Sequence, residues 1–164
     1  MKQIILFLVL MSAAAGAKAG DGSPFLQLSL TPEIALHSRD TTIKGISLNI
    51  WGENPQRGAA IGFVNGSTGD STGFSLGIVN YSEMYYGVQI GFVNTSSKSY
   101  TGWQDGAVNI AKEMQGLQSG VVNYTESLNG VQLGLVCIVK ENPWFSEFPK
   151  KLATGFPFVN WSFK

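Results

Sequence analysis

The chain has 164 residues, of which eleven are basic and eleven acidic, so no surplus of positive charge indicates nucleic-acid binding. Its one cysteine, Cys137, excludes an internal disulfide and a cysteine-built metal site. Only 13% of the residues are charged, whereas 20 are glycine and 12% are aromatic; because a soluble domain averages about 25% charged residues, this favours a membrane barrel or a stacked β-repeat.

The first nineteen residues have the features of a signal peptide. Lys2 supplies the positive charge, Ile4–Met11 forms an apolar stretch, and Ala17–Ala19 is a small-x-small cleavage site. The apolar stretch is far shorter than the about 20 residues that span a bilayer. We therefore predict export, with residues 1–19 as a signal peptide and residues 20–164 as a single β-repeat domain.

Two strands are expected ahead of the main repeat. In Phe25–Leu30 apolar and polar residues alternate, as they do in a half-buried strand. Pro32 then interrupts the pattern. Ile43–Trp51 resembles a diverged copy of the unit that follows, and we expect it to be a strand as well.

Six similar units then run from Gly58 to Cys137. Each reads glycine, apolar residue, usually Gln or Ser, any residue, glycine, apolar residue, Val, Asn, and the units start 14 or 15 residues apart. Such a period of about 14.5 residues predicts one small structural unit copied in tandem, each copy covering its neighbour. The residues that define the repeat are the second glycine and the closing Asn of the units, namely Gly62, Asn65, Gly77, Asn80, Gly91, Asn94, Gly106, Asn109, Gly120, Asn123 and Gly134.

Each unit is expected to be a strand. In Gly87–Asn94 the side chains of Val88, Ile90 and Phe92 fall on one side of an extended chain, and glycine and Gln89 fall on the other. Two glycines in eight residues disfavour a helix. The six or seven residues between units are rich in Ser, Thr, Gly, Glu and Lys, which is typical of exposed turns.

The C-terminal part is expected to close the array. Asn142–Lys151 contains two prolines and is predicted to be a loop, and Gly155–Phe163 to be a final strand. The whole chain then has nine or ten strands, and no helix is predicted after residue 19.

Two architectures can bury such strands. One is an antiparallel meander, either curled or closed into a small β-barrel, and the other is a parallel β-solenoid. In a solenoid Gln89, Gln104, Gln118 and Gln132 would form a ladder, and the closing Asn residues would form another.

Length and polarity weigh towards the meander. Eight extended residues reach about 26 Å, and a coil would have to return in six or seven nearly straight ones. The return segment should also carry inward apolar residues, and Gly66–Thr72 has none. We therefore predict an all-β fold of about 14.5-residue strand-turn repeats in an antiparallel meander or small barrel, with the solenoid as the alternative.

The barrel interpretation has one difficulty. If Val88, Ile90 and Phe92 face lipid, their equivalents in the next units include Asp105 and Ser119, and a charge facing hydrocarbon costs several kcal/mol. Aromatic residues gather at strand ends and turns, where they would form an interfacial girdle on a barrel or cover the core of a soluble repeat. These residues are Tyr81, Tyr85, Tyr86, Tyr100, Trp103, Tyr124 and Trp144.

The unit Gly87–Asn94, the preceding Leu-Gln-Leu-Ser-Leu strand and the end at Phe156–Asn160 together resemble the exported surface-repeat proteins of spirochaetes and other Gram-negative bacteria. The resemblance covers roughly Phe25–Phe163. It implies a cell-envelope protein and brings no catalytic residues. Some members have the features of lipoproteins, whereas this chain has no cysteine at the expected cleavage point.

No arrangement of residues indicates chemistry. His37 is the single histidine, and with its neighbours Ser38 and Asp40 it lacks the geometry of a catalytic triad, so we interpret it as a loop residue. Cys137 takes the place of the Asn of the other units and is interpreted as a buried, inert thiol. We predict no enzyme activity, no catalytic residues, no cofactor and no metal site.

The prediction from sequence is therefore a non-enzymatic cell-envelope protein at the outer membrane or cell surface, with a structural or interaction role. Outer-membrane lipid or other envelope components are the expected partners, and nucleic acid is not. One alternative is a soluble periplasmic or secreted binding module whose turns are the recognition surface. Another is a small barrel pore lined by Gln89, Gln104, Gln118 and Gln132.

Overall fold

The computed structural model describes residues 22–163, and these residues form one open, mixed β-sheet in the strand order β1-β2-β3-β4. The strands are β1 (Leu26–Ser29), β2 (Ile46–Asn54), β3 (Arg57–Val139) and β4 (Gly155–Ser162). The all-β class is therefore confirmed. The predicted signal peptide lies outside the described residues. Within residues 22–163, no helix has both the length and the apolar character needed to cross a membrane.

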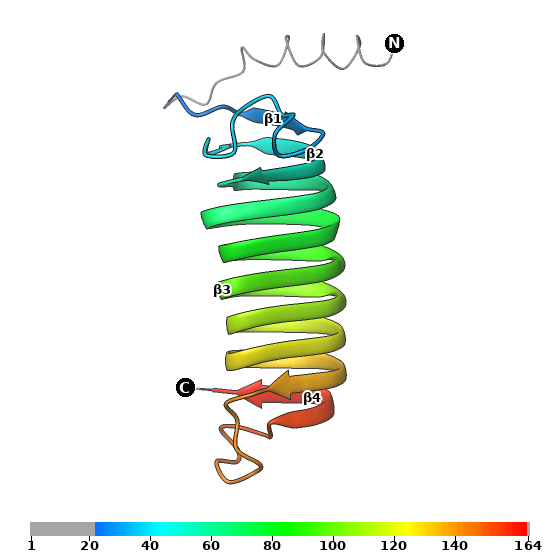
Figure 1. Ribbon diagram of the computed structural model, residues 1–164. Helices are drawn as coiled ribbons and strands as arrows, with labels where there is room; N and C mark the ends of the chain where they lie inside the picture. The colour runs from blue at the N-terminus through cyan, green and yellow to red at the C-terminus, as the bar shows by residue number, and fades with distance from the viewer. Residues whose placement is uncertain (1–21, 164) are drawn as a thin grey trace.

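The long strand β3 accounts for the shape of the molecule. Its 83 residues wind into a stack of coils, with β1 and β2 at one end and β4 at the other (Figure 1). β1 pairs with β2 and β2 with β3 in parallel, so that Ile46 lies opposite Ala59. This is the pairing of the parallel solenoid. The antiparallel pairing favoured by the length argument occurs between β3 and β4.

The argument against a solenoid failed because it assumed an apolar interior. Gln89 is fully buried, whereas Phe92, three residues on, has 64% of its surface exposed. The return segment of the coil turns Ser67 and Ser71 inward, and both are buried. The interior beneath the repeat units is thus largely polar, and the apolar side chains of the units point outward.

Closing Asn residues of successive units form an interior ladder, the Asn column. Asn94 Nδ2 donates to Asn109 Oδ1 at 2.8 Å and to the backbone carbonyl of Asp105 at 2.9 Å. Each Asn thereby satisfies a side chain and a main-chain group of the next coil, as buried polar groups require. The column consists of Asn49 of β2 and the closing residues Asn65, Asn80, Asn94, Asn109 and Asn123, and each of the first five donates to the next at 2.8–3.0 Å.

A second ladder lies beside it, as expected for a solenoid. Gln132 Nε2 donates to Gln118 Oε1 and Gln118 Nε2 to Gln104 Oε1, both at 2.8 Å. Gln104 Nε2 donates to Gln89 Oε1 at 3.2 Å. All four Gln side chains are fully buried, so this Gln column fills the interior of the coils.

The first glycine of each unit makes the bend between turn and strand possible. Gly87 has a φ of 145°, a region that L-residues rarely adopt. A Cβ at this position would collide with the carbonyl oxygen of Gly73 in the neighbouring coil. At the second glycine of the unit the reason is space: a Cβ at Gly91 would lie 2.6 Å from Asn80 Nδ2. The repeat-defining glycines therefore make room for the Asn column.

An apolar core lies on the turn side of the coils. It consists of Tyr85, Tyr100, Ala111, Met114, Leu128 and Val139. The rings of Tyr85 and Tyr100 stack with centroids 5.7 Å apart. The aromatic residues predicted at strand ends thus separate into two kinds, because these two belong to the core while Tyr86 and Trp144 are exposed.

Both ends of the stack are covered by the chain itself. At the N-terminal end Leu36 N donates to Leu28 O, so the loop after β1 folds back over that strand. At the C-terminal end Leu152 N donates to Trp161 O, and the residues before β4 cover its outer edge. Solenoids require such caps, because an open strand edge pairs with other chains.

Candidate functional site

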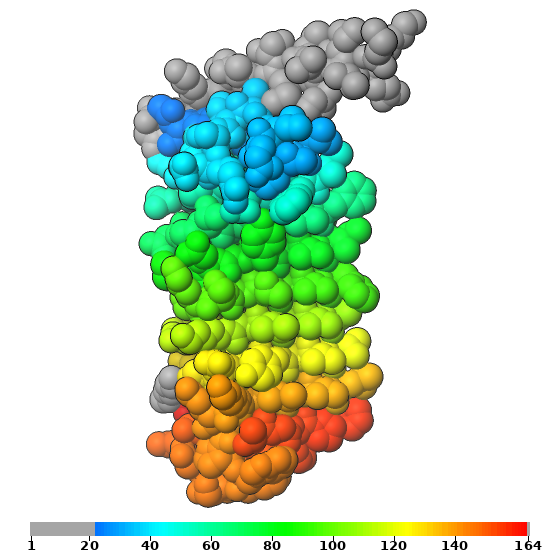
Figure 2. Space-filling model, in the orientation of Figure 1, coloured from blue at the N-terminus to red at the C-terminus, as the bar shows by residue number. Residues whose placement is uncertain are grey.

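The most distinctive surface of the molecule is an outward-facing apolar side of the coils. The coils form parallel ribs of side chains along the molecule (Figure 2). On each rib the residues three and five positions after the first glycine point outward, because side chains alternate along a strand and the residues two and four positions after that glycine point inward. We call this surface the apolar face, and its β3 residues are Ile61, Phe63, Leu76, Ile78, Ile90, Phe92, Asp105, Ala107, Ser119, Val121, Leu133 and Leu135.

Exposure of these side chains is unusually high for their type. Phe63 has 59% of its surface exposed, Ile78 51% and Leu135 59%. The face continues onto β2, where Leu48 and Ile50 are also exposed. It continues onto β4 as well, because Val159 lies opposite Leu133. Contiguous apolar surface of this extent is rare on a soluble monomer and marks an interaction site.

One polar group interrupts the apolar face. Ser119 Oγ donates to Asp105 Oδ1, and Trp103 Nε1 donates to Ser119 Oγ at 2.7 Å. Asp105 and Ser119 are the two residues that conflicted with a lipid-facing interpretation of the sequence. The structure brings them together on adjacent coils, so the carboxylate has a donor of its own.

The turn edge of the coils is charged. Lys98 Nζ lies 2.7 Å from Glu83 Oε2, and Lys140 Nζ lies 3.3 Å from Glu126 Oε1, each pair joining neighbouring coils. The hydrogen bond from Lys98 holds the pKa of Glu83 below its usual value. Among the described residues no cluster of three or more His, Cys, Asp or Glu side chains could hold a metal ion.

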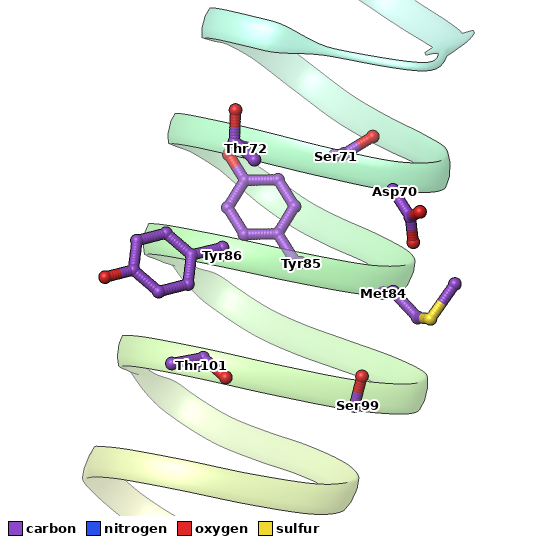
Figure 3. Close-up of a pocket in the computed structure, with 8 residues that line it drawn as sticks. All are labelled: Asp70, Ser71, Thr72, Met84, Tyr85, Tyr86, Ser99 and Thr101. Atoms are coloured by element: carbon purple, nitrogen blue, oxygen red, sulfur yellow. The ribbon is translucent and has the colours of Figure 1, made fainter.

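A recess of about 260 Å³ opens at this turn edge (Figure 3). It arises from unequal turn lengths. The chain has two residues between the inward-facing Ser82 and Tyr85, whereas the coils on either side have three at the same place. The shorter turn therefore lies deeper, between Asp70 of one neighbour and Ser99 of the other.

Tyr85 forms the inner wall of the recess. Its hydroxyl is buried and has no hydrogen-bond partner, and burial raises its pKa. The Tyr100 hydroxyl is better placed, because it lies 3.0 Å from Gly87 O and 2.9 Å from Trp103 O. In Figure 3 the Tyr86 side chain points away from the coil, beside Tyr85.

A hydrogen-bonded chain of side chains borders the apolar face near β2. Trp51 Nε1 donates to Tyr81 Oη at 3.1 Å, and Tyr81 Oη donates to Glu53 Oε2 at 2.7 Å. Arg39 Nη2 lies 2.5 Å from Glu53 Oε1. Burial raises the pKa of Tyr81 to about 12.

The residues singled out in the sequence lie in the interior of the coils or in hydrogen-bonded loops. The second glycines and Asn residues of the units lie in the interior, away from the apolar face. Cys137 ends the Asn column with its sulfur 3.8 Å from Asn123 Nδ2, and burial raises the pKa of its thiol. Ser38 Oγ lies 2.9 Å from Thr41 Oγ1, and His37 N donates to Gln27 Oε1.

Sequence reasoning identified the alternation within each unit but not which side faces solvent. The Gln and Asn ladders that a solenoid implies would have indicated it, because a strand that buries these amides turns its apolar side towards solvent. Comparison of the chain with protein-family models, curated proteins and solved structures gives no match. The resemblance to surface-repeat proteins therefore stays a prediction.

Proposed function

We propose that this protein is a non-enzymatic component of the cell envelope, associated with the outer membrane, that has a structural or interaction role. The apolar face is the surface through which it interacts. The single observation that carries the proposal is the set of exposed apolar side chains that extends from Leu48 to Leu135 and is interrupted at Asp105 and Ser119.

The interior supports a structural rather than a catalytic role. Its polar side chains are engaged with one another, as Ser75 Oγ shows by donating to Asn80 Oδ1 at 2.7 Å. The Gln and Asn columns tie each coil to the next. Such a stack is a stiff rod, because every coil is held by its neighbours through main-chain and side-chain hydrogen bonds.

The proposal is tested by fractionation of Gram-negative cells that express the full chain. We expect the protein in the envelope fraction, resistant to osmotic shock and released by detergent. A variant with Phe63→Thr, Ile78→Thr and Phe92→Thr should move to the aqueous fraction, since threonine keeps strand propensity but removes apolar surface.

The matched control carries Tyr86→Ser and Trp144→Ser. These residues are 66% and 62% exposed but lie off the apolar face. This control should stay in the envelope fraction. Release of the unmodified protein by osmotic shock alone, without detergent, would contradict the proposal.

One observation favours a second candidate function. The recess beside Tyr85 lies on the turn edge, where a soluble binding module would carry its recognition surface. In that case Tyr86→Ser would impair function while the apolar-face variant would not, and the unmodified protein would be found in the aqueous fraction.

A further inference from the structure

A second recess, which we call the apolar recess, opens at the C-terminal end of the rod where β3 meets β4. Its volume is about 350 Å³, which lies within the range of about 300–1,000 Å³ of small-molecule sites. The lining residues are Leu135, Val136, Ile138, Gly155, Phe156 and Pro157. None of their side chains is charged or carries a hydrogen-bond donor or acceptor. The side-chain chemistry of the recess therefore suits hydrocarbon.

A β-bulge accompanies the recess. Leu135 and Val136 of β3 lie in a register shift, opposite the single residue Pro157 of β4. Such a bulge interrupts the ladder of hydrogen bonds and re-aims side chains, and it is common next to functional sites. Leu135 and Val136 are left 59% and 45% exposed. A Cβ added at Gly155 would meet no atom within 4 Å, so the recess offers open space beside that residue.

Phe158, which directly follows the lining residue Pro157, has a backbone conformation that does not suit its side chain. Its φ is 70°, in the left-handed region that bulky residues rarely adopt. The ring gains no burial in return, because 69% of the residue is exposed. Local features that cost stability concentrate at functional sites. The exposed ring of Phe158 therefore points to a partner outside the folded chain.

Charged groups of both signs lie beyond the Ile138 end of the recess. Ile138 and Lys140 project outward on either side of the buried Val139. Lys140 Nζ lies 3.3 Å from Glu126 Oε1 in an exposed pair. Glu126 and Glu141 also line a polar recess of about 260 Å³. A phosphoethanolamine head group complements this arrangement, because its phosphate attracts Lys140 and its ammonium attracts the carboxylates.

We propose that the apolar recess binds one acyl chain of a phospholipid that has a phosphoethanolamine head group, with the head group beside Lys140. Hydrocarbon matches a lining without polar side chains, because no buried donor or acceptor is left unpaired. The inference rests on the proposed association with the outer membrane and adds the chemistry of one lipid contact. Leu135 belongs to the apolar face as well, so the recess continues that face at its C-terminal end.

Isothermal titration calorimetry of the purified full chain with lysophosphatidylethanolamine tests the site. This probe has a single acyl chain and the proposed head group, and below its micellar concentration it offers the protein no membrane surface. We expect saturable binding of one molecule per chain. Absence of binding, or binding without a fixed stoichiometry, overturns the inference.

Gly155→Leu fills the recess and at the same time adds apolar surface. The space around the Cβ position allows the variant to fold, which circular dichroism checks. We expect its Kd to rise at least about tenfold, because the acyl chain loses buried contact area. Gln115→Leu adds the same side chain at an exposed position on the turn edge and should leave the Kd unchanged. An unchanged Kd in Gly155→Leu overturns the inference, since adsorption to any apolar surface would then explain the binding.

Phe158→Asn is a second test that does not depend on filling the recess. Asn adopts the left-handed conformation readily, so the Tm should be no lower than that of the unmodified protein. The Kd should rise at least about threefold, because apolar contact is lost. Tyr86→Ser is the matched control, since Tyr86 is 66% exposed and lies on the turn edge, and it should leave the Kd unchanged. A lower Tm with an unchanged Kd would overturn the role of Phe158 in the site.

Two further probes test the head group. Lysophosphatidylglycerol has no ammonium and palmitate has no phosphate, so each should bind at least about threefold more weakly than lysophosphatidylethanolamine. Lys140→Gln should remove part of this preference. Lys98→Gln, from another exposed Lys–Glu pair, should not. Tighter binding of palmitate would make a free fatty acid the ligand and overturn the assignment to a phospholipid.

Cell fractionation separates this inference from the proposed function. Gly155→Leu leaves the side chains of the apolar face unchanged, so this variant should stay in the envelope fraction. An envelope protein that binds none of the three probes overturns the lipid site alone. Release of the unmodified protein by osmotic shock overturns the proposed function, whatever the calorimetry gives.

Discussion

Asn94 donates its side-chain amide to Oδ1 of Asn109 at 2.8 Å, and this contact between residues one coil apart recurs along the rod. The same amide of Asn94 reaches the carbonyl of Asp105, and Asn94 Oδ1 accepts from Asn80. A single interior side chain thus joins three coils.

Replacement of Asn94 by Ala should be strongly destabilising. It removes three hydrogen bonds of a buried side chain, each contributing about 1 kcal/mol, and leaves donors and acceptors unpaired. We expect the free energy of unfolding to fall by about 3 kcal/mol, measured by urea titration followed by circular dichroism. Gln115→Ala, at an exposed position, is the control and should change it by less than about 0.5 kcal/mol. Equal effects of the two substitutions would contradict the role of the Asn column.

Gly87→Ala tests the bend between turn and strand. The substitution combines an unfavourable φ with a collision against Gly73 O, and we expect a loss of at least about 3 kcal/mol or failure to fold. Gly69→Ala separates the two causes, because Gly69 has a φ of 58° but open space around its Cβ position. That variant should lose only about 1–2 kcal/mol. Thermal unfolding monitored by circular dichroism compares the two.

Tyr85 and Tyr100 predict opposite responses to the same substitution. Tyr85→Phe removes a buried hydroxyl that has no partner, so the protein should be stabilised by about 1 kcal/mol. Tyr100→Phe removes a hydroxyl that lies within hydrogen-bond distance of two carbonyls, and should cost about 1 kcal/mol. Urea titration of the two variants side by side measures the difference. A loss of stability in Tyr85→Phe would show that its hydroxyl has a partner in solution.

Glu53 predicts a pH dependence of stability. Burial alone would raise the pKa of Glu53, but hydrogen bonds from Tyr81 and Arg39 outweigh it and the pKa is lowered. A carboxyl group with a lowered pKa stabilises the fold above its ordinary pKa of 4.5, and this contribution is lost as pH falls through the folded-state pKa. Glu53→Gln should therefore be less stable than the unmodified protein at pH 7, and the gap should close in acid.

The matched control for that pH series is Glu83→Gln. Glu83 also has a lowered pKa, from its hydrogen bond with Lys98, but that pair is solvent-exposed. Surface ion pairs contribute little to stability, so this variant should follow the unmodified protein at every pH. A constant gap between Glu53→Gln and the unmodified protein down to acid pH would exclude the proposed linkage.

The positions of strands and turns follow from the local sequence pattern. The way in which the strands pair does not. The alternation in Gly87–Asn94 is enough to predict a strand, and the turn compositions predict where strands bend. Whether the strands pair in parallel or antiparallel depends on contacts between units, and the sequence of a single unit is compatible with both. The polar interior decides between the two pairings. The buried side-chain amides of Gln89 and Asn94 form hydrogen bonds when an identical amide lies one coil away.

The candidate site was predictable only in part. The apolar residues of the units were visible, but they are normally assigned to a core because burying apolar surface is favourable. Here their inward neighbours are glycines and amides, so Ile78 and Phe92 remain outside. The recess beside Tyr85 depends on a difference of one residue between turns, and its depth emerges only once coils of unequal length are stacked.

The caps at β1 and β4 make the length of the rod an adjustable property. Each interior coil contacts the coils next to it, and the ends are covered by segments that do not take part in the repeat. A gene duplication of one unit would extend the molecule by about 4.8 Å and leave both termini unchanged. Chains with different numbers of units would thus differ in length by whole coils.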